Sequence, residues 1–208
     1  MVHIVDGALS TEVVATGAVL GIAAVAYGLK RMDIETMPRV AVLSAVFFVA
    51  SLVHVPIGPS SVHLILNGLT GLMLGWAAFP ALLIALLLQA VFFGFGGLTV
   101  LGINTVNIAL PGVLVWLAFG FMLNRVDGKW LWGIGFAAGS LAIALTSVFV
   151  GISLALSGQE FIPAAKLVFI AHVPVMVVEG VLTAAALVLI KKVRPALLSP
   201  MQVAGSPA

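Results

Sequence analysis

The sequence predicts an all-α integral membrane protein with seven transmembrane helices, the N-terminus outside and the C-terminus in the cytoplasm. Two observations predict this class. Hydrophobic residues make up 62% of the 208 residues and charged residues only 8%, whereas a soluble globular domain is about a quarter charged. The apolar residues also fall into runs that can cross a bilayer core of about 30 Å at about 1.5 Å per residue. The composition therefore excludes a soluble globular protein.

The first apolar run extends from Leu9 to Leu29. A cleaved signal peptide is the alternative interpretation, but it would need a basic start, and residues 1–9 contain Asp6 and neither Lys nor Arg. The further predicted spans are Arg39 to Val53, Val62 to Phe79, Ala81 to Phe95, Asn104 to Leu123, Trp130 to Leu156 and Ala165 to Ile190.

The positive charges predict the orientation, because cytoplasmic loops of membrane proteins carry an excess of Lys and Arg. With seven spans, Lys166 falls on one side and all other positive residues on the opposite side, namely Lys30, Arg31, Arg39, Arg125, Lys129, Lys191, Lys192 and Arg194. Residues 1–8, the loop 54–62, the segment 94–104 and the loop 157–164 then share the outer face. Residues 1–195 form one transmembrane domain, and 196–208 are expected to be a disordered cytoplasmic tail.

The composition also restricts the chemistry. Because the chain has no cysteine, any metal ion would be bound by imidazole, carboxylate, amide or the terminal amine. The net charge of +2 is small and forms no basic stripe, so a nucleic-acid partner is not expected. No nucleophile, paired carboxylates or metalloprotease spacing indicates an enzyme.

The stretch from His54 to Gly68 interrupts the apolar pattern. Pro56 and Pro59 prevent a continuous helix there, so His54 and His63 should flank a short structured loop. His63 is a candidate metal ligand, with simple hydration at the membrane interface as the alternative. His54 is more typical of an interfacial or loop-bracing residue.

His3 lies close enough to the chain start to form fused chelate rings with the terminal amine and backbone amides. If Met1 is retained, the Met1 amine, the Val2 and His3 amides and the His3 ring supply four nitrogens. If Met1 is removed, the Val2 amine, the His3 amide and the His3 ring supply three, and His63 completes the set. Planar nitrogen coordination favours Ni(II) or Cu(II), and also allows a constrained Co(II). A solvated histidine on a frayed terminus is the alternative.

Four buried amide side chains, Asn67, Gln89, Asn104 and Asn107, could orient an imidazole or hold the loop backbone. Asn67 is predicted to follow His63 by one helical turn on the same face. Hydrogen bonding between helices, without any contact to a substrate, is the alternative for all four.

His172 and Glu179 lie seven residues apart on the last span and so should share a helix face, with Pro174 between them. They could form the proton relay of a self-sufficient, proton-coupled metal carrier, or a structural hydrogen-bond centre.

Three glycine pairs with four-residue spacing, Gly17 with Gly21, Gly71 with Gly75 and Gly135 with Gly139, predict close helix packing within the chain, and docking to a partner membrane protein is the alternative. A membrane scaffold or sensor without substrate stays open as well.

Four stretches together resemble the CbiM/NikM family, the substrate-binding membrane components of energy-coupling factor transporters for cobalt and nickel. They are residues 3–10 (HIVDGALS), 56–64 (PIGPSSVHL), 89–104 (QAVFFGFGGLTVLGIN) with Asn107, and 172–176 (HVPVM) with Glu179 and Gly180.

The resemblance implies an ATP-driven importer of Co(II) or Ni(II) in the cytoplasmic (inner) membrane of a prokaryote. Its partners would be a transmembrane coupling component, cytoplasmic ATPase subunits and a small accessory membrane subunit. The family usually starts Met-His, whereas Val2 intervenes here. The family's ligand set of terminal amine, His amide, His ring and loop His therefore maps onto Val2, His3 and His63 if Met1 is removed. The sequence of residues 60–64 (SSVHL) resembles the cobalt branch of the family more than the nickel branch.

Overall fold

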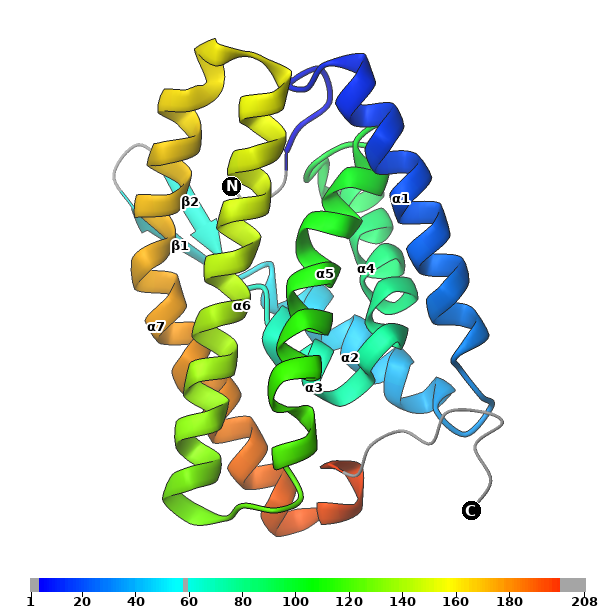
Figure 1. Cartoon of the computed structure of the whole chain (residues 1–208), viewed down its shortest axis with the longest axis vertical. Coiled ribbons are helices and arrows are strands. Elements are labelled where there is room, and N and C mark those ends of the chain that lie inside the picture. The colour runs from blue at the N-terminus through cyan, green and yellow to red at the C-terminus, as the bar shows by residue number, and fades with distance from the viewer. Residues whose placement is uncertain (1–3, 58–59, 199–208) are drawn as a thin grey trace.

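In the part of the chain that the structure describes, seven α-helices and one β-hairpin follow one another (Figure 1). The computed structural model describes residues 4–57 and 60–198, and of 54–57 and 60–62 it describes the backbone alone. The helices are α1 Thr11–Lys30, α2 Met37–Ala50, α3 Asn67–Leu74, α4 Ala78–Phe93, α5 Leu101–Phe119, α6 Gly128–Ser157 and α7 Ile162–Val193, and the hairpin is β1 His54–Ile57 with β2 Ser60–His63. The predicted helical class is confirmed, with the hairpin as an addition.

Five helical stretches in the described ranges are long and apolar enough to cross a membrane. They are Thr11–Lys30, Asn67–Phe93, Leu101–Met122, Gly128–Ser157 and Gln159–Val193. By contrast, α2 has 14 residues and a length of about 21 Å, which is short of a bilayer core of about 30 Å. The protein is thus a multi-pass membrane protein with five candidate spans, and the count of seven stays a prediction.

The predicted boundary between the third and fourth spans is wrong. No helix begins at Val62, because residues 60–63 pair with β1 as a strand, and α3 starts only at Asn67. The helical stretch then breaks at Gly75, whose φ of +53° lies in the left-handed region that favours glycine. The predicted break between Phe79 and Ala81 is absent, because Pro80 lies in the first turn of α4, where a missing backbone N–H costs nothing.

Small residues bring the helices together. α6 and α7 form a long antiparallel pair (Figure 1), and a Cβ added at Gly135 would stand 2.6 Å from Ala184 Cα. On the opposite side of the molecule, Gly21 lies against the Gly102 backbone and joins α1 to α5. Gly71 meets Gly112 between α3 and α5 so closely that an added Cβ would overlap it. Close packing within the chain is therefore confirmed, although Gly75 serves as a turn.

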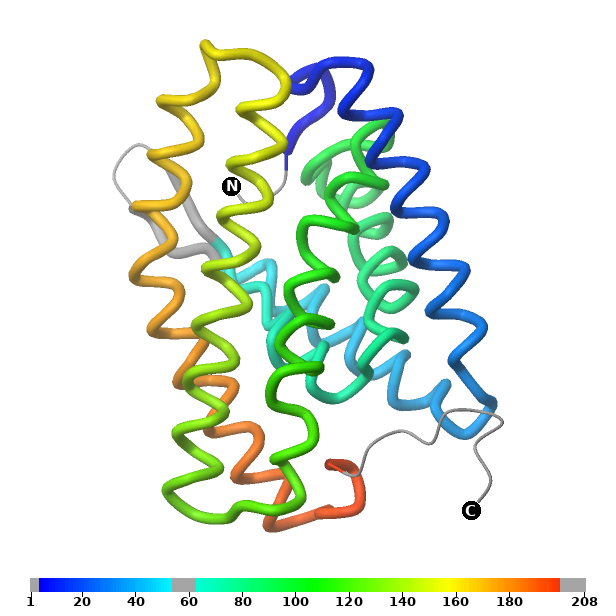
Figure 2. Tube along the Cα trace, viewed as in Figure 1, coloured from blue at the N-terminus to red at the C-terminus, as the bar shows by residue number. Residues whose placement is uncertain are grey.

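The positive residues of the described chain, with the exception of Lys166, gather at one end of the bundle. Figure 2 shows the end of α1, the start of α2, the α5–α6 connection and the end of α7 at the lower end. There Lys191 Nζ donates to Leu123 O at 3.1 Å and lies 3.5 Å from Asp127 Oδ1. The α6–α7 connection and the segment before α1 lie at the opposite end (Figure 2). The arrangement agrees with the charge separation predicted from the sequence.

Candidate metal site

His63 ends the second strand of the hairpin and lies inside the bundle. Its side chain is 1% exposed, and its Nδ1 lies 3.0 Å from Leu64 O. A proton on Nδ1 donated to this carbonyl places the ring's lone pair on Nε2, the form in which imidazole binds metal ions. In the antiparallel register His63 stands opposite His54, whose side chain is not among those described. The His63 side chain thus lies in the protein interior.

The N-terminal segment enters the bundle before α1 begins (dark blue in Figure 1). Ile4 is 5% exposed, and its backbone forms a two-way pair with the side-chain amide of Asn104 on α5. Ile4 N donates to Asn104 Oδ1 at 3.1 Å, and Asn104 Nδ2 donates to Ile4 O at 2.9 Å. The amide thus satisfies both backbone groups of a buried residue, as a neighbouring strand would. This pairing fixes the backbone one residue after His3.

A second contact, at Asp6, holds the same segment. The Asp6 carboxylate accepts hydrogen bonds from the Thr99 hydroxyl, from Thr99 N at 3.1 Å and from Val100 N at 3.3 Å. Val100 is the residue before α5, so the carboxylate meets the positive end of that helix. The Thr99 hydroxyl and these amides hold the pKa of Asp6 below its ordinary value of 3.8. Asp6 is therefore ionised at neutral pH and keeps its contact to α5.

The backbone that follows His63 is bound by α7. The Glu179 carboxyl group, which is fully buried, accepts hydrogen bonds from Ile65 N and from Leu66 N, the latter at 2.9 and 3.0 Å. These amides precede α3 and have no partner within that helix. Leu66 has a φ of +52°, a conformation that few residues other than glycine adopt. Glu179 is thus a hydrogen-bond centre between α7 and the start of α3, which was one of its two predicted roles.

Asn67 does not align with His63 as predicted, because His63 belongs to β2 and Asn67 begins α3. Its Nδ2 donates to Ile108 O on α5 and to Thr146 Oγ1 on α6, both at 2.8 Å. Asn67 therefore fixes the start of α3 to two neighbouring helices instead of orienting the imidazole.

Asn107 and Gln89 behave differently from each other. Asn107 Nδ2 donates to Ser153 Oγ at 3.1 Å and joins α5 to α6, so it is bound within the bundle. Gln89 on α4 is fully buried, and neither atom of its amide has a partner among the described residues. It lies four residues before the end of α4, and Asn104 lies three residues after the start of α5. Both amides are thus about one helical turn from the α4–α5 connection.

His172 is 1% exposed, on the side of α7 that carries Glu179 seven residues later. Its Nδ1 lies 2.6 Å from Val168 O, one turn earlier in the helix, and its Nε2 has no partner among the described residues. α7 also contacts β2. His172 is therefore a buried imidazole on α7.

The other predicted ligands, Met1, Val2 and His3, lie outside the described residues. Within the described part of the chain, no group of three or more His, Asp or Glu side chains could hold a metal ion. A site at His63 would thus need ligands of another kind, such as a terminal amine and a backbone amide.

Two contributors to this region were missed by the sequence reasoning. Thr99 and Ser153 hold Asp6 and Asn107 respectively. Single hydroxyl residues in apolar runs are common, so neither carried a signal of its own. Asp6 was considered only in the argument against a signal peptide and as part of the family pattern, although its position before an apolar run could have suggested a contact with a helix start.

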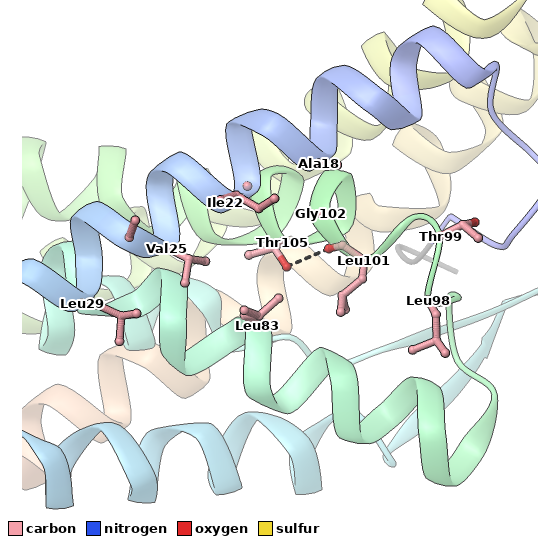
Figure 3. Close-up of a pocket in the computed structure, with 12 residues that line it drawn as sticks. Ala18, Ile22, Val25, Leu29, Leu83, Leu98, Thr99, Leu101, Gly102 and Thr105 are labelled. Carbon is pink, nitrogen blue, oxygen red and sulfur yellow. Dashed lines mark hydrogen bonds between the residues drawn. The ribbon is translucent and has the colours of Figure 1, made fainter.

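The groove between α1, α4 and α5 is a different kind of feature (Figure 3). It is lined mainly by aliphatic side chains such as Ile22, Val25 and Leu83. The Thr105 hydroxyl in its wall donates to Leu101 O at 2.8 Å, as the dashed line shows. The groove offers no ligand set for a transition metal ion.

The apolar spans and the buried polar interior define a multi-pass membrane protein, and the comparisons with known proteins place it in the metal-transport class. Across 92% of this chain and 93% of the other, the fold matches a crystal structure described as that of a transition metal transporter, with a TM-score of 0.80 and 26% identity. The model of the CbiM family, cobalt uptake substrate-specific transmembrane region, matches residues 3–197. The chain belongs to this family.

Individual relatives agree with this assignment. A Haemophilus influenzae protein whose name assigns it to metal transport is 39% identical over 95% of this chain and 97% of its own length. The cobalt transport protein CbiM of Sorangium cellulosum is 32% identical over 80% of this chain and 78% of its own. The fused nickel transport protein NikMN of Rhodobacter capsulatus is 38% identical over 54% of this chain and 34% of its own. Cobalt and nickel are thus the substrates for which the relatives are named.

Proposed function

We propose that this protein is the substrate-specific membrane component of an ATP-driven cobalt or nickel importer. It binds Co(II) or Ni(II) from the outer face, and ATP hydrolysis takes place on partner subunits, with a transmembrane coupling component between them. Its location is the cytoplasmic membrane of a prokaryote. Family membership and the five candidate spans support the transport role.

The observation that carries the proposed binding site is the pairing of Ile4 with Asn104. It holds the backbone of Ile4, the residue that directly follows His3 in the sequence, against α5. His63 is buried in the bundle, and its Nδ1 lies within hydrogen-bond distance of Leu64 O. We propose that the Val2 amine, the His3 amide, the His3 ring and the His63 ring form the first coordination shell after removal of Met1.

The surrounding side chains fit this site in different ways. Asn104 and Asp6 hold the N-terminal segment, and the Gln89 amide, which has no partner among the described residues, offers two donors and an acceptor. Glu179 already accepts two backbone hydrogen bonds, which favours an importer subunit over a carrier that uses Glu179 as a proton relay. Since the amine and an amide must lose protons to bind a metal, affinity should fall as the pH falls.

The test is Ni(II) and Co(II) binding by the purified protein, with intact mass to establish whether Met1 is present. His3→Ala, His63→Ala and a variant with one extra N-terminal residue should each weaken binding strongly. Lys166→Ala, at the same end of the bundle but outside the site, is the control and should bind like the wild type. Unchanged affinity in all three site variants would refute the proposed site.

A further inference from the structure

The backbone between His63 and α3, together with the first residue of α3, is held by contacts from three helices. α7 contributes Glu179, which accepts from Ile65 N and Leu66 N across a sequence separation of more than one hundred residues. α5 and α6 contribute Ile108 O and Thr146 Oγ1, which both accept from Asn67. The chain is therefore fixed at successive residues directly after the candidate ligand.

Glu179 is itself held in place by the packing of α6 on α7. A Cβ added at Gly139 on α6 would stand 2.6 Å from Glu179 O, and one added at Gly68 on α3 would stand 3.0 Å from Gly139 Cα. Three helices thus meet at Gly139 with no room for an additional methyl group. The Glu179 backbone cannot move toward α6, so the carboxyl group presents its oxygens from a fixed position.

We propose that Glu179 is a positioning residue of the metal site, acting through His63. This inference rests on the proposed function. His63 lies two residues before Ile65, about 7 Å along an extended backbone, so a shift of the Ile65 and Leu66 amides shifts the imidazole. Metal sites tolerate such shifts poorly, because outer hydrogen bonds orient the ligands.

The cost of a carboxyl group at this depth supports the same role. A buried acidic group in a membrane protein is expensive and is retained where it has a specific partner. Here the partners are two backbone N–H groups at a helix start, which would otherwise be buried without an acceptor. An aliphatic residue at 179 would leave both amides unpaired, and the unusual φ of Leu66 would lose its support.

The experiment compares Ni(II) affinity in Glu179→Ala and Glu179→Gln with that of Ser140→Ala. Ser140 Oγ donates to Met176 O at 2.8 Å in the same α6–α7 interface, but it does not contact residues 65 and 66. Glu179→Ala should weaken binding about 10- to 100-fold. Glu179→Gln retains one acceptor oxygen and should lose less. Ser140→Ala should bind like the wild type.

A double-mutant cycle with His63→Ala separates positioning from general damage. If Glu179 acts through His63, Glu179→Gln should cause no further loss once His63 is absent, and the weak binding that remains comes from the N-terminal nitrogens. The visible absorption spectrum of bound Ni(II) in Glu179→Gln should also shift toward that of His63→Ala, and the spectrum of Ser140→Ala should not. An equal loss in both backgrounds, or affinity and spectrum like the wild type in folded Glu179→Gln, would overturn the inference.

This outcome is distinguishable from failure of the proposed function. If wild-type protein binds Ni(II) and His63→Ala weakens the binding, the proposed site holds whatever Glu179→Gln does. If His63→Ala binds like the wild type, both the proposed site and this inference are overturned.

Discussion

Ile4 and Asn104, one hundred positions apart in the sequence, form a two-way pair in which each donates one hydrogen bond to the other. One turn later on α5, Ile108 O accepts from Asn67, the first residue of α3. A single helix therefore fixes both the segment that follows His3 and the segment that follows His63. The two contacts lie one helical turn apart on α5.

Loss of the Asn104 amide should detach the N-terminal segment. Asn104→Ala removes both hydrogen bonds to Ile4, and Ni(II) affinity should fall about 10- to 100-fold, as it does when outer-shell partners are removed. Isothermal titration of detergent-purified protein measures this. Asn107→Ala is the matched control, since it removes an amide of the same helix that pairs with Ser153. Equal losses of Ni(II) affinity in the two variants would contradict the role assigned to Asn104.

The Asp6 contact should depend on charge. Asp6→Asn keeps the shape of the side chain but loses the charge at the start of α5, so metal affinity should fall several-fold at neutral pH.

The pH dependence of metal affinity separates the contribution of the Asp6 contact from that of the nitrogen ligands. The folded state lowers the pKa of Asp6 below 3.8, so its stabilising contribution is complete above the unfolded pKa and is lost only as pH falls through the lower, folded value. Between pH 7.5 and 5 the loss of metal binding should therefore come from protonation of the nitrogen ligands, with equal slopes in wild type and Asp6→Asn. A difference in slope in this range would show that Asp6 titrates there.

A methyl group at Gly97 should displace Asp6. A Cβ at this position would overlap the Asp6 carboxyl group, so Gly97→Ala should weaken metal binding in the same direction as Asp6→Asn. Gly133→Ala is the control, because nothing lies within 4 Å of a Cβ there. It should leave affinity unchanged and raise helix stability slightly. Affinity in Gly97→Ala like that of Gly133→Ala would rule out the close contact.

Asn67 should contribute to stability. Asn67→Ala leaves Ile108 O and Thr146 without this donor. It should lower the free energy of unfolding by about 1–2 kcal/mol, the range for side-chain hydrogen bonds between membrane helices. Thr183→Val is a suitable comparison, since the buried Thr183 hydroxyl has no partner among the described residues, and it should be neutral or slightly stabilising. Thermal unfolding in detergent ranks the two variants, and a larger loss of stability in Thr183→Val than in Asn67→Ala would contradict the role assigned to Asn67.

The sequence predicted the helical class and the long helices well, because apolar runs and charge position follow directly from the bilayer. It did not predict the start of α3. Residues 62–66 are apolar enough to continue a helix, yet residues 60–63 pair with β1, and the Glu179 contact holds Ile65 and Leu66 outside the helix. Hydrogen bonds between residues more than one hundred positions apart leave no local pattern.

The candidate site was predictable only in part, because its contacts also join residues that are far apart in the sequence. His63 and Asn104 were both singled out from the sequence as polar groups in apolar surroundings. Their actual partners, Leu64 O and the Ile4 backbone, depend on how α5 and the hairpin meet. The roles of Asn67 and Asn107 as links between helices are likewise set by tertiary packing.

X-ray absorption of the Ni(II)-loaded protein tests the central claim most directly, because it counts and identifies the donor atoms. The account predicts four nitrogen donors in a planar set, with one imidazole lost in His3→Ala and one lost in His63→Ala. An oxygen-rich, six-coordinate ion whose spectrum is unchanged in both variants would contradict it.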